Sequence, residues 1–391
     1  MRHRLLRVAL AFKILTASTV ASGLAQTTTP PSAPPDEPKS MIDRLKEPDQ
    51  AGGLHFTEHW AVAFGGIKQG SGAGAGPAWS TKFADGGFVQ LKAVISIRNF
   101  RLLQARYDTR RFWNERAIVV SRLRWHDAPE VKLYRLGPDS PDRHVDYAER
   151  RTELSSQLVM TLRPALRAAG GFGVERFRTR ADNLVELFEE DPSLALAAPP
   201  PGLGAQPLFA HAFARLGYDT RLSPDYTRAG RFLEGELHTY QDVHGKEDAF
   251  GRFEGTAEQY IPTHGGRGVI GVGMRTWLSL AEGERSVPFY LTPTLGGGDL
   301  LRAYPSYRFR DRHAILYIAQ YRWAVHKMVD LAGTYEAGKV APTVDGLTFD
   351  NIAQSIALGV RLHTQKTGLV RADVAYGREG VGFRIGFTAG G

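Results

Sequence analysis

Most of this chain alternates apolar and polar side chains with a period of two, in segments of roughly ten residues. In residues 312–323, for example, Tyr317 and Tyr321 alternate with Gln320 and Arg322. A period of two is the spacing of side chains on one face of a β-strand. Strands of this length cross a bilayer when they are tilted. The alternation therefore predicts an all-β fold and excludes a helical bundle.

Fourteen segments carry this alternation or a similar one: 54–67, 86–108, 116–126, 152–163, 171–180, 208–221, 230–242, 249–261, 267–281, 312–323, 327–338, 353–363, 370–376 and 382–387. Glycine-containing turns such as 265–268 and 366–368 separate them. The segment 182–190 is the one candidate for a short loop helix. We expect the glycine-rich stretch Gly65–Gly76 to form a turn, and it contains no Gly-Lys-Ser/Thr sequence that would hold a phosphate.

Alternation alone does not distinguish a membrane barrel from a soluble sandwich. Many segments, however, end in Tyr, Trp or Phe, as the aromatic girdle of a membrane barrel requires. Their polar faces carry Arg, Asp, Glu and Gln at mid-strand, which a wet lumen tolerates and an apolar core does not. A closed barrel also leaves no sheet edge exposed in lipid. We therefore predict a transmembrane antiparallel β-barrel of the outer membrane.

The N-terminus has the pattern of an exported protein. Residues 1–25 begin with basic residues and continue as an apolar stretch that ends in Gly-Leu-Ala, which predicts a cleaved signal peptide. Residues 26–53 are rich in proline and predict a disordered tether, and 54–391 form the predicted barrel domain. The alternative for the first segment is a buried N-terminal helix. The location that follows is the outer membrane of a Gram-negative cell.

Composition excludes several function classes. The chain has no Cys, which rules out disulfides, thiolate zinc sites and a catalytic thiol. Its formal net charge is +8, but Arg2, Arg4, Arg7 and Lys13 lie in the predicted leader, and without them about +4 is left. The other charges alternate in sign along the chain. We therefore expect no nucleic-acid binding.

No motif predicts an active site. The chain contains neither His-Glu-x-x-His nor Gly-x-Ser-x-Gly, so metalloprotease and hydrolase-elbow chemistry are not indicated. Asp219 and Arg221 share one strand face and are interpreted as a lumenal ion pair. We expect no enzymatic activity, no cofactor and no metal site.

The sequence from Val287 to Arg312 resembles the bacterial surface antigen family of BamA/TamA-like outer-membrane barrels. The hallmark of that family is an aliphatic-Arg-Gly-aromatic tetrad on an inward-folded extracellular loop, a place taken here by Leu301, Arg302, Ala303 and Tyr304. Further similar segments are 133–140, 218–221 with Pro224 and Gly230, 334–338, and the C-terminal barrel signal of Gly382, Ile385 and Phe387. The resemblance implies about 16 strands, five of them after the loop. A tether this short is too small for a POTRA domain, so a barrel-only member is expected.

The family also implies how the loop is held. Arg302 cannot stay unpaired inside a lumen, and Glu336, followed by Gly338, lies in the strand that supplies the partner in the family. Asp373 is the second choice. A wet lumen would keep their coupling on the order of 1–2 kcal/mol. The alternative is that Arg302 belongs to a solvated extracellular loop, and Ala303 in place of Gly predicts a different loop turn.

The function implied by the resemblance is insertion or translocation of proteins at the outer membrane. A passive pore or structural envelope protein is the alternative, and a lipid hydrolase ranks well below both. The expected partners are outer-membrane lipids and lipopolysaccharide, the barrel-assembly machinery during biogenesis, and periplasmic partner or client proteins.

Overall fold

The computed structural model describes residues 53–180, 200–202, 204, 206–221, 223–245, 249–281, 287–298, 300–364 and 368–387. The predicted leader, the tether up to residue 52 and the predicted helix at 182–190 lie outside the described residues. Within these ranges, no helix is long and apolar enough to cross a membrane.

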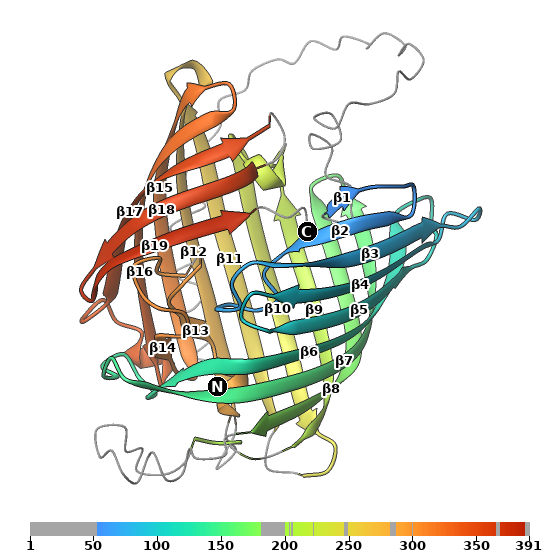
Figure 1. Cartoon of the computed structure of the whole chain (residues 1–391), viewed down its shortest axis with the longest axis horizontal. Coiled ribbons are helices and arrows are strands. Elements are labelled where there is room, and N and C mark those ends of the chain that lie inside the picture. The colour runs from blue at the N-terminus through green and yellow to red at the C-terminus, as the bar shows by residue number, and fades with distance from the viewer. Residues whose placement is uncertain are drawn as a thin grey trace. The chain divides into compact units, whose positions relative to one another are not determined.

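Strands make up nearly all of the regular structure (Figure 1). The main sheet contains β1 (Gly53–His55), β2 (Trp60–Gly65), β3 (Gly74–Lys82), β4 (Phe88–Ser96), β5 (Arg101–Asp108), β6 (Ala117–Tyr134), β7 (His144–Arg163), β8 (Leu166–Arg180), β9 (Leu208–Asp219), β10 (Gly230–Asp242), β11 (Ala249–Thr263), β12 (Gly268–Leu280), β15 (His313–His326), β16 (Val329–Ala341), β17 (Ala353–His363), β18 (Gly368–Gly377) and β19 (Gly380–Phe387). A separate two-stranded sheet pairs β13 (Thr294–Leu295) with β14 (Phe309–Arg310). The single-turn helices are η1 (Pro224–Tyr226), η2 (His264–Gly266), η3 (Phe289–Leu291) and η4 (Val344–Gly346).

The main sheet is an antiparallel meander in which each strand pairs with the next along the chain. Within the described residues, this sheet has 16 strands apart from the three-residue β1, and five of them follow the connection after β12, as predicted. In the part of the chain that the structure describes, no strand register joins β19 to β1 or β2, so the sheet curves as a barrel without closing.

Several predicted boundaries are wrong, and two of the errors concern β3, β4 and β5. The segment 86–108 is not one strand but the hairpin of β4 and β5, which turns at residues 97–100. The predicted turn 65–76 ends earlier, because Gly74 opens β3. A Cβ on Gly76 would collide with the carbonyl oxygen of Ala93 in β4, so this glycine allows the close approach of two strands.

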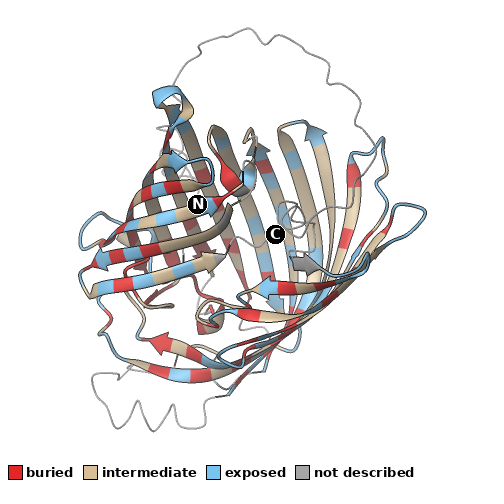
Figure 2. Ribbon diagram, turned by 45° about the horizontal axis from the view of Figure 1, so that its top comes forward, coloured by how far each residue is buried: buried red, intermediate tan, exposed pale blue. Residues whose placement is uncertain are grey.

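The predicted register of β15 is confirmed. Leu316 and Arg322 on the inner face are buried, whereas Ala319 and Tyr321 on the outer face are exposed. Ile318 pairs with Glu336 of β16, whose side chain is 0% exposed. Figure 2 shows the same alternation of buried and exposed positions along neighbouring strands. One face of each strand therefore lines the lumen and the other forms the outer surface of the sheet, which the sequence predicts to face lipid.

The register predicts that a polar substitution destabilises the sheet far more on its outer face than on its inner face. Ala319 lies at the middle of β15 on the outer face, so Ala319→Arg should lower the free energy of unfolding by about 2–4 kcal/mol in a bilayer. Ile318→Gln, its inward neighbour, should cost much less. Urea unfolding in liposomes measures both variants. A larger loss for Ile318→Gln would mean that the register is shifted by one residue.

Candidate functional site

The connection between β12 and β15 folds back against the inner face of the sheet. We call its described residues, 287–298 and 300–312, the inward connection. It begins with η3, and β13 and β14 pack against β16 (Figure 1). Its tight turn contains Gly296–Gly298, all with positive φ. A Cβ on Gly296 would collide with the carbonyl oxygen of Pro305, so only glycine allows the connection to fold so closely on itself.

One wall carboxylate holds Arg302 at two points. The backbone N–H of Arg302 donates to Oε2 of Glu336 at 2.7 Å, and its Nη1 donates to Oε1 at 2.5 Å. The Glu336 side chain is 0% exposed and that of Arg302 is 7% exposed. The structure thus brings the first-choice carboxylate and the arginine together, in a buried pair and not in a wet one. Arg302 therefore does not lie in a solvated loop outside the barrel.

The second-choice carboxylate lies beside the same arginine. Asp373 Oδ2 is 3.6 Å from Nε of Arg302, and Asp373 Oδ1 accepts a hydrogen bond of 2.6 Å from Arg361 Nη2. Asp373 is 1% exposed. Two carboxylates on β16 and β18 therefore face two guanidinium groups, and this balance of charge makes the burial of Glu336, Asp373 and Arg302 tolerable.

The other residues of the tetrad also contact the wall. The N–H of Ala303 donates to Oγ of Ser355 at 3.0 Å, and the carbonyl of Tyr304 accepts from Arg384 Nη2 at 2.6 Å. The positive φ of this turn is at Leu301 (70°) and not at Ala303. Alanine is therefore accommodated without the backbone strain that a positive φ would impose.

Two predicted glycines make room for the connection. A Cβ on Gly338 would lie 2.8 Å from Cδ1 of Leu295, and one on Gly382 would lie 3.1 Å from the carbonyl oxygens of Arg302 and Ala303. The C-terminal signal residues are not brought together at this site. Gly382 faces the connection, Ile385 is 58% exposed on the outer face, and β19 ends at Phe387.

Arg308 is a further anchor of the inward connection that the sequence did not predict. Its guanidinium donates to Glu379 in the β18–β19 turn at 2.9 Å, to Oγ of Ser140 at 2.6 Å and to the carbonyl of Ser140 at 2.7 Å. Ser140 lies in the β6–β7 connection, within the 133–140 segment that carried part of the resemblance. The N–H of Gly137 in that segment also donates to the carbonyl of Arg310 at 2.9 Å. The spacing Arg308, Arg310, Arg312 was the available signal.

A tyrosine fixes the inward connection to the β2–β3 turn. The hydroxyl of Tyr307 donates to the carbonyl of Gln69 at 2.6 Å. Burial and the nearby Glu149 carboxylate raise the pKa of Tyr307, so its phenol stays neutral and remains a donor. Lys68 of the same turn binds Glu149 at 2.6 Å.

The β9–β10 turn enters the barrel from the opposite end, since successive connections of a meander alternate between its ends. Its Tyr226 donates a hydrogen bond to Asp330 of β16 and stacks on His363 of β17, with ring centroids 3.8 Å apart. Arg322 of β15 donates to the carbonyl of Thr227. Burial, and then the bond to Asp330, raise the pKa of Tyr226 and keep it protonated. The turn therefore reaches across the lumen to the far wall.

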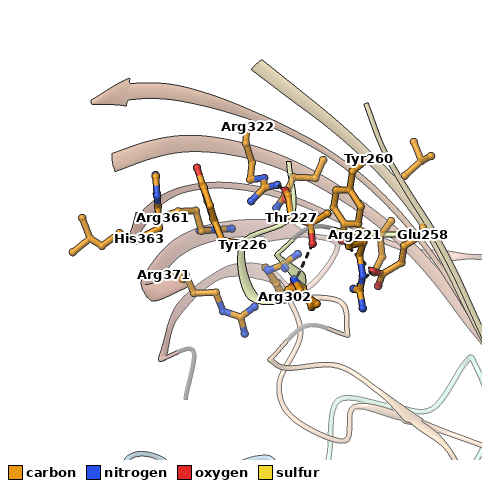
Figure 3. Close-up of a pocket in the computed structure, with 18 of the residues that line it drawn as sticks. Arg221, Tyr226, Thr227, Glu258, Tyr260, Arg302, Arg322, Arg361, His363 and Arg371 are labelled. Carbon is orange, nitrogen blue, oxygen red and sulfur yellow. Dashed lines mark hydrogen bonds and ion pairs between the residues drawn. The ribbon is translucent and has the colours of Figure 1, made fainter. Parts of the chain in front are cut away.

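A cavity of about 340 Å³ lies between this turn and the inward connection. Its lining is rich in arginine, as Figure 3 shows for Arg221, Arg302, Arg322, Arg361 and Arg371. Carboxylates beside the cavity pair with several of these guanidinium groups, as Glu336 does with Arg302 and Asp373 with Arg361. Arg221 binds Asp219 at 2.9 Å, which is the predicted ion pair. Among the described residues, no group of three or more His, Asp or Glu side chains could hold a metal ion.

The Arg302–Glu336 pair predicts a strong coupling. Each single change, Arg302→Ala or Glu336→Ala, leaves the other charge buried, so each should cost about 3–5 kcal/mol. The double variant should cost less than the sum of the two, by about 2 kcal/mol or more, because the pair is buried. Protease cleavage within 300–312, followed against denaturant concentration, measures the free energy of releasing the connection.

The wall pair Arg215–Glu236 provides the matched control. It joins β9 and β10 through two bonds of 2.7 and 3.0 Å and does not involve the inward connection. Replacing either residue by alanine should leave cleavage within 300–312 unchanged. Additive costs for Arg302 and Glu336 would contradict their role in holding the connection.

Comparisons with known proteins agree with this geometry at the level of the fold. No protein-family model matches the chain. No curated protein matches it significantly. Among solved structures, BamA from Haemophilus ducreyi lacking POTRA domains 1-3 matches with a TM-score of 0.62 and 11% identity, over 84% of this chain and 69% of that chain.

CdiB from Acinetobacter baumannii and CdiB from Escherichia coli both match with a TM-score of 0.53, at 8% and 11% identity. The match covers 84% of this chain but only 59% and 60% of the two CdiB chains. This chain thus spans less than two thirds of their length. The chain has the fold of the BamA and CdiB barrels, as the resemblance in its sequence implied.

Proposed function

We propose that this chain acts at the outer membrane in the insertion or translocation of polypeptides. The observation that carries the proposal is the inward connection, which is fastened inside a barrel whose first and last strands are not paired. The similarity of fold to BamA and CdiB supports it. The proposal includes an exported protein, with residues 1–25 as its signal peptide, and no enzymatic reaction.

The contacts of the tetrad and Arg308 are concentrated on the last strands of the sheet. Glu336 is on β16, Ser355 on β17, Arg384 on β19, and Glu379 in the turn between β18 and β19. These strands form one side of the unpaired seam. The connection therefore braces the edge strand β19 and the strands next to it, and it does so with charge-assisted hydrogen bonds.

The seam suggests how a client would be received. A sheet edge presents unpaired N–H and C=O groups, and an extended segment of another chain can add to it as a further strand. In a bilayer such groups have no water to bond, so pairing with an incoming strand is favoured. We infer that the edges at β19 and at β1–β2 receive a client strand while the inward connection keeps β16–β19 in place.

The alternative function is a passive pore or structural envelope protein. A steady pore needs a continuous open lumen, whereas here both the inward connection and the β9–β10 turn reach into it. The proposed partners are outer-membrane lipids, the machinery that assembles this barrel, and client or periplasmic proteins. Each of these partners is part of the proposal.

Reconstitution tests the proposed function. Liposomes containing the chain should accelerate the folding of a urea-unfolded eight-stranded barrel protein, measured by its shift in gel mobility, relative to empty liposomes. Arg302→Ala should reduce this acceleration because β16–β19 lose their brace, and Arg215→Ala should not. Folding at the rate seen in empty liposomes would contradict an insertase role.

Planar-bilayer conductance distinguishes the passive pore. The wild-type barrel should conduct poorly and fitfully, because its own connection obstructs the lumen. Glu336→Ala should give larger and more frequent openings. A large and steady conductance of the wild type, together with no effect on client folding, would favour the pore.

A further inference from the structure

Four arginines lie close together on the outer face of β7 and β8. We call Arg150, Arg176, Arg178 and Arg180 the arginine patch. All four are exposed. The β7–β8 register pairs Arg150 directly with Arg178, and it places Arg176 and Arg180 two residues away on either side, on the same face of the sheet. The patch is therefore a continuous cationic surface on the side of the barrel that faces lipid.

The patch begins where the apolar band of the barrel ends. One row of paired residues across β6–β9 is entirely apolar: Leu123, Leu154, Val174 and Ala210. The next row is mixed and contains Trp125, Thr152, Arg176 and Leu208. A groove of about 390 Å³ crosses these two rows and is lined by apolar side chains together with Arg150, Arg176 and Arg178. Tryptophan at the edge of an apolar band is typical of the membrane–water interface.

The charge of the patch is largely uncompensated. Arg150 binds Asp127 at 3.2 Å. Within the ranges that the structure describes, Arg176, Arg178 and Arg180 form no ion pair. Guanidinium groups on neighbouring strands repel one another, so this arrangement gains stability from an anion that binds several of them.

Contacts of the inward connection show at which end of the barrel the arginine patch lies. Phe177, next to Arg176, stacks on Tyr290 of the inward connection with ring centroids 4.8 Å apart. The N–H of Phe289 donates to the carbonyl of Pro201, in the connection that follows β8, at 2.9 Å. The patch therefore lies at the end where the inward connection starts, which the proposed function makes the extracellular end.

We propose that the arginine patch and its groove bind a phosphorylated glycolipid of the outer leaflet, that is, the lipid A part of lipopolysaccharide. The proposal rests on the membrane location and orientation given under the proposed function. The planar fork of a guanidinium matches phosphate oxygens in bidentate geometry, and the paired arginines would share one phosphate. The groove below them takes an acyl chain against Trp125, Leu154 and Val174. A site of this kind anchors the barrel beside its β6–β9 wall.

Binding of purified bis-phosphorylated lipid A to the full chain in detergent micelles tests the proposal by native mass spectrometry. Arg176→Ala/Arg178→Ala should weaken binding roughly 30-fold, the effect of two cations near an anionic lipid surface. Arg231→Ala/Arg267→Ala is the matched control. It removes the same charge from two exposed arginines at the opposite end of the barrel, and binding should not change. Arg176→Lys/Arg178→Lys should restore part of the affinity, since lysine keeps the charge without the fork.

Phosphatidylglycerol serves as the second probe, and heat-dependent gel mobility shows that each variant is folded. Equal weakening by the two double alanine variants would overturn the proposal, because any surface charge would then serve. Phosphatidylglycerol binding as tight as lipid A binding would also overturn it, since a phosphate alone would then suffice. Lipid A binding at the patch by a protein that does not accelerate client folding would support this proposal and count against the proposed insertase role.

Discussion

The carboxylate of Glu336 is the contact on which the position of the inward connection depends. It is fully buried on a wall strand, and both of its oxygens accept hydrogen bonds from Arg302. A buried carboxylate without such partners would be strongly destabilising. The carboxylate and the connection therefore stabilise each other. Because one bond goes to the backbone of Arg302, the interaction fixes the path of the chain as well as the position of one side chain.

Other contacts then distribute this attachment around the barrel. Arg308 joins the connection to Ser140 on one side of the seam and to Glu379 on the other. Tyr307 adds the β2–β3 turn. A sheet whose edges are unpaired is normally a liability in lipid. Here side-chain contacts through the lumen supply part of the stabilisation that hydrogen bonds between the first and last strands would give. In the proposed function, the unpaired seam is where a client strand adds.

The sequence predicted those parts of the fold that depend on local pattern. Alternation predicted the inner and outer faces of β15, and the count of strands after the connection was correct. The sequence did not predict where long strands begin and end, or which loops contact each other, because the spacing of residues carries no information on either. β6 and β7 extend over 18 and 20 residues, well beyond the predicted segments 116–126 and 152–163. A bulge between Ala128 and Val131 shifts the register of the two strands without ending them, so the period of two is lost there although both strands continue. The alternating arginines at 308, 310 and 312 were a signal for Arg308, but its partner Ser140 is distant in sequence, and no local pattern joins two such loops.

The inward connection and the β9–β10 turn both obstruct the lumen, and this affects the route that a polypeptide would take. Passage through the lumen requires release of the Arg302–Glu336 pair, and also of the β9–β10 turn, which Tyr226 and Arg322 tie to the far wall. Each attachment involves buried charged groups, so losing both would be costly. Addition of a strand at the seam requires neither to move. Under the proposed function, the two obstructions therefore favour insertion at the sheet edge over translocation through the lumen, with the inward connection holding that edge in place.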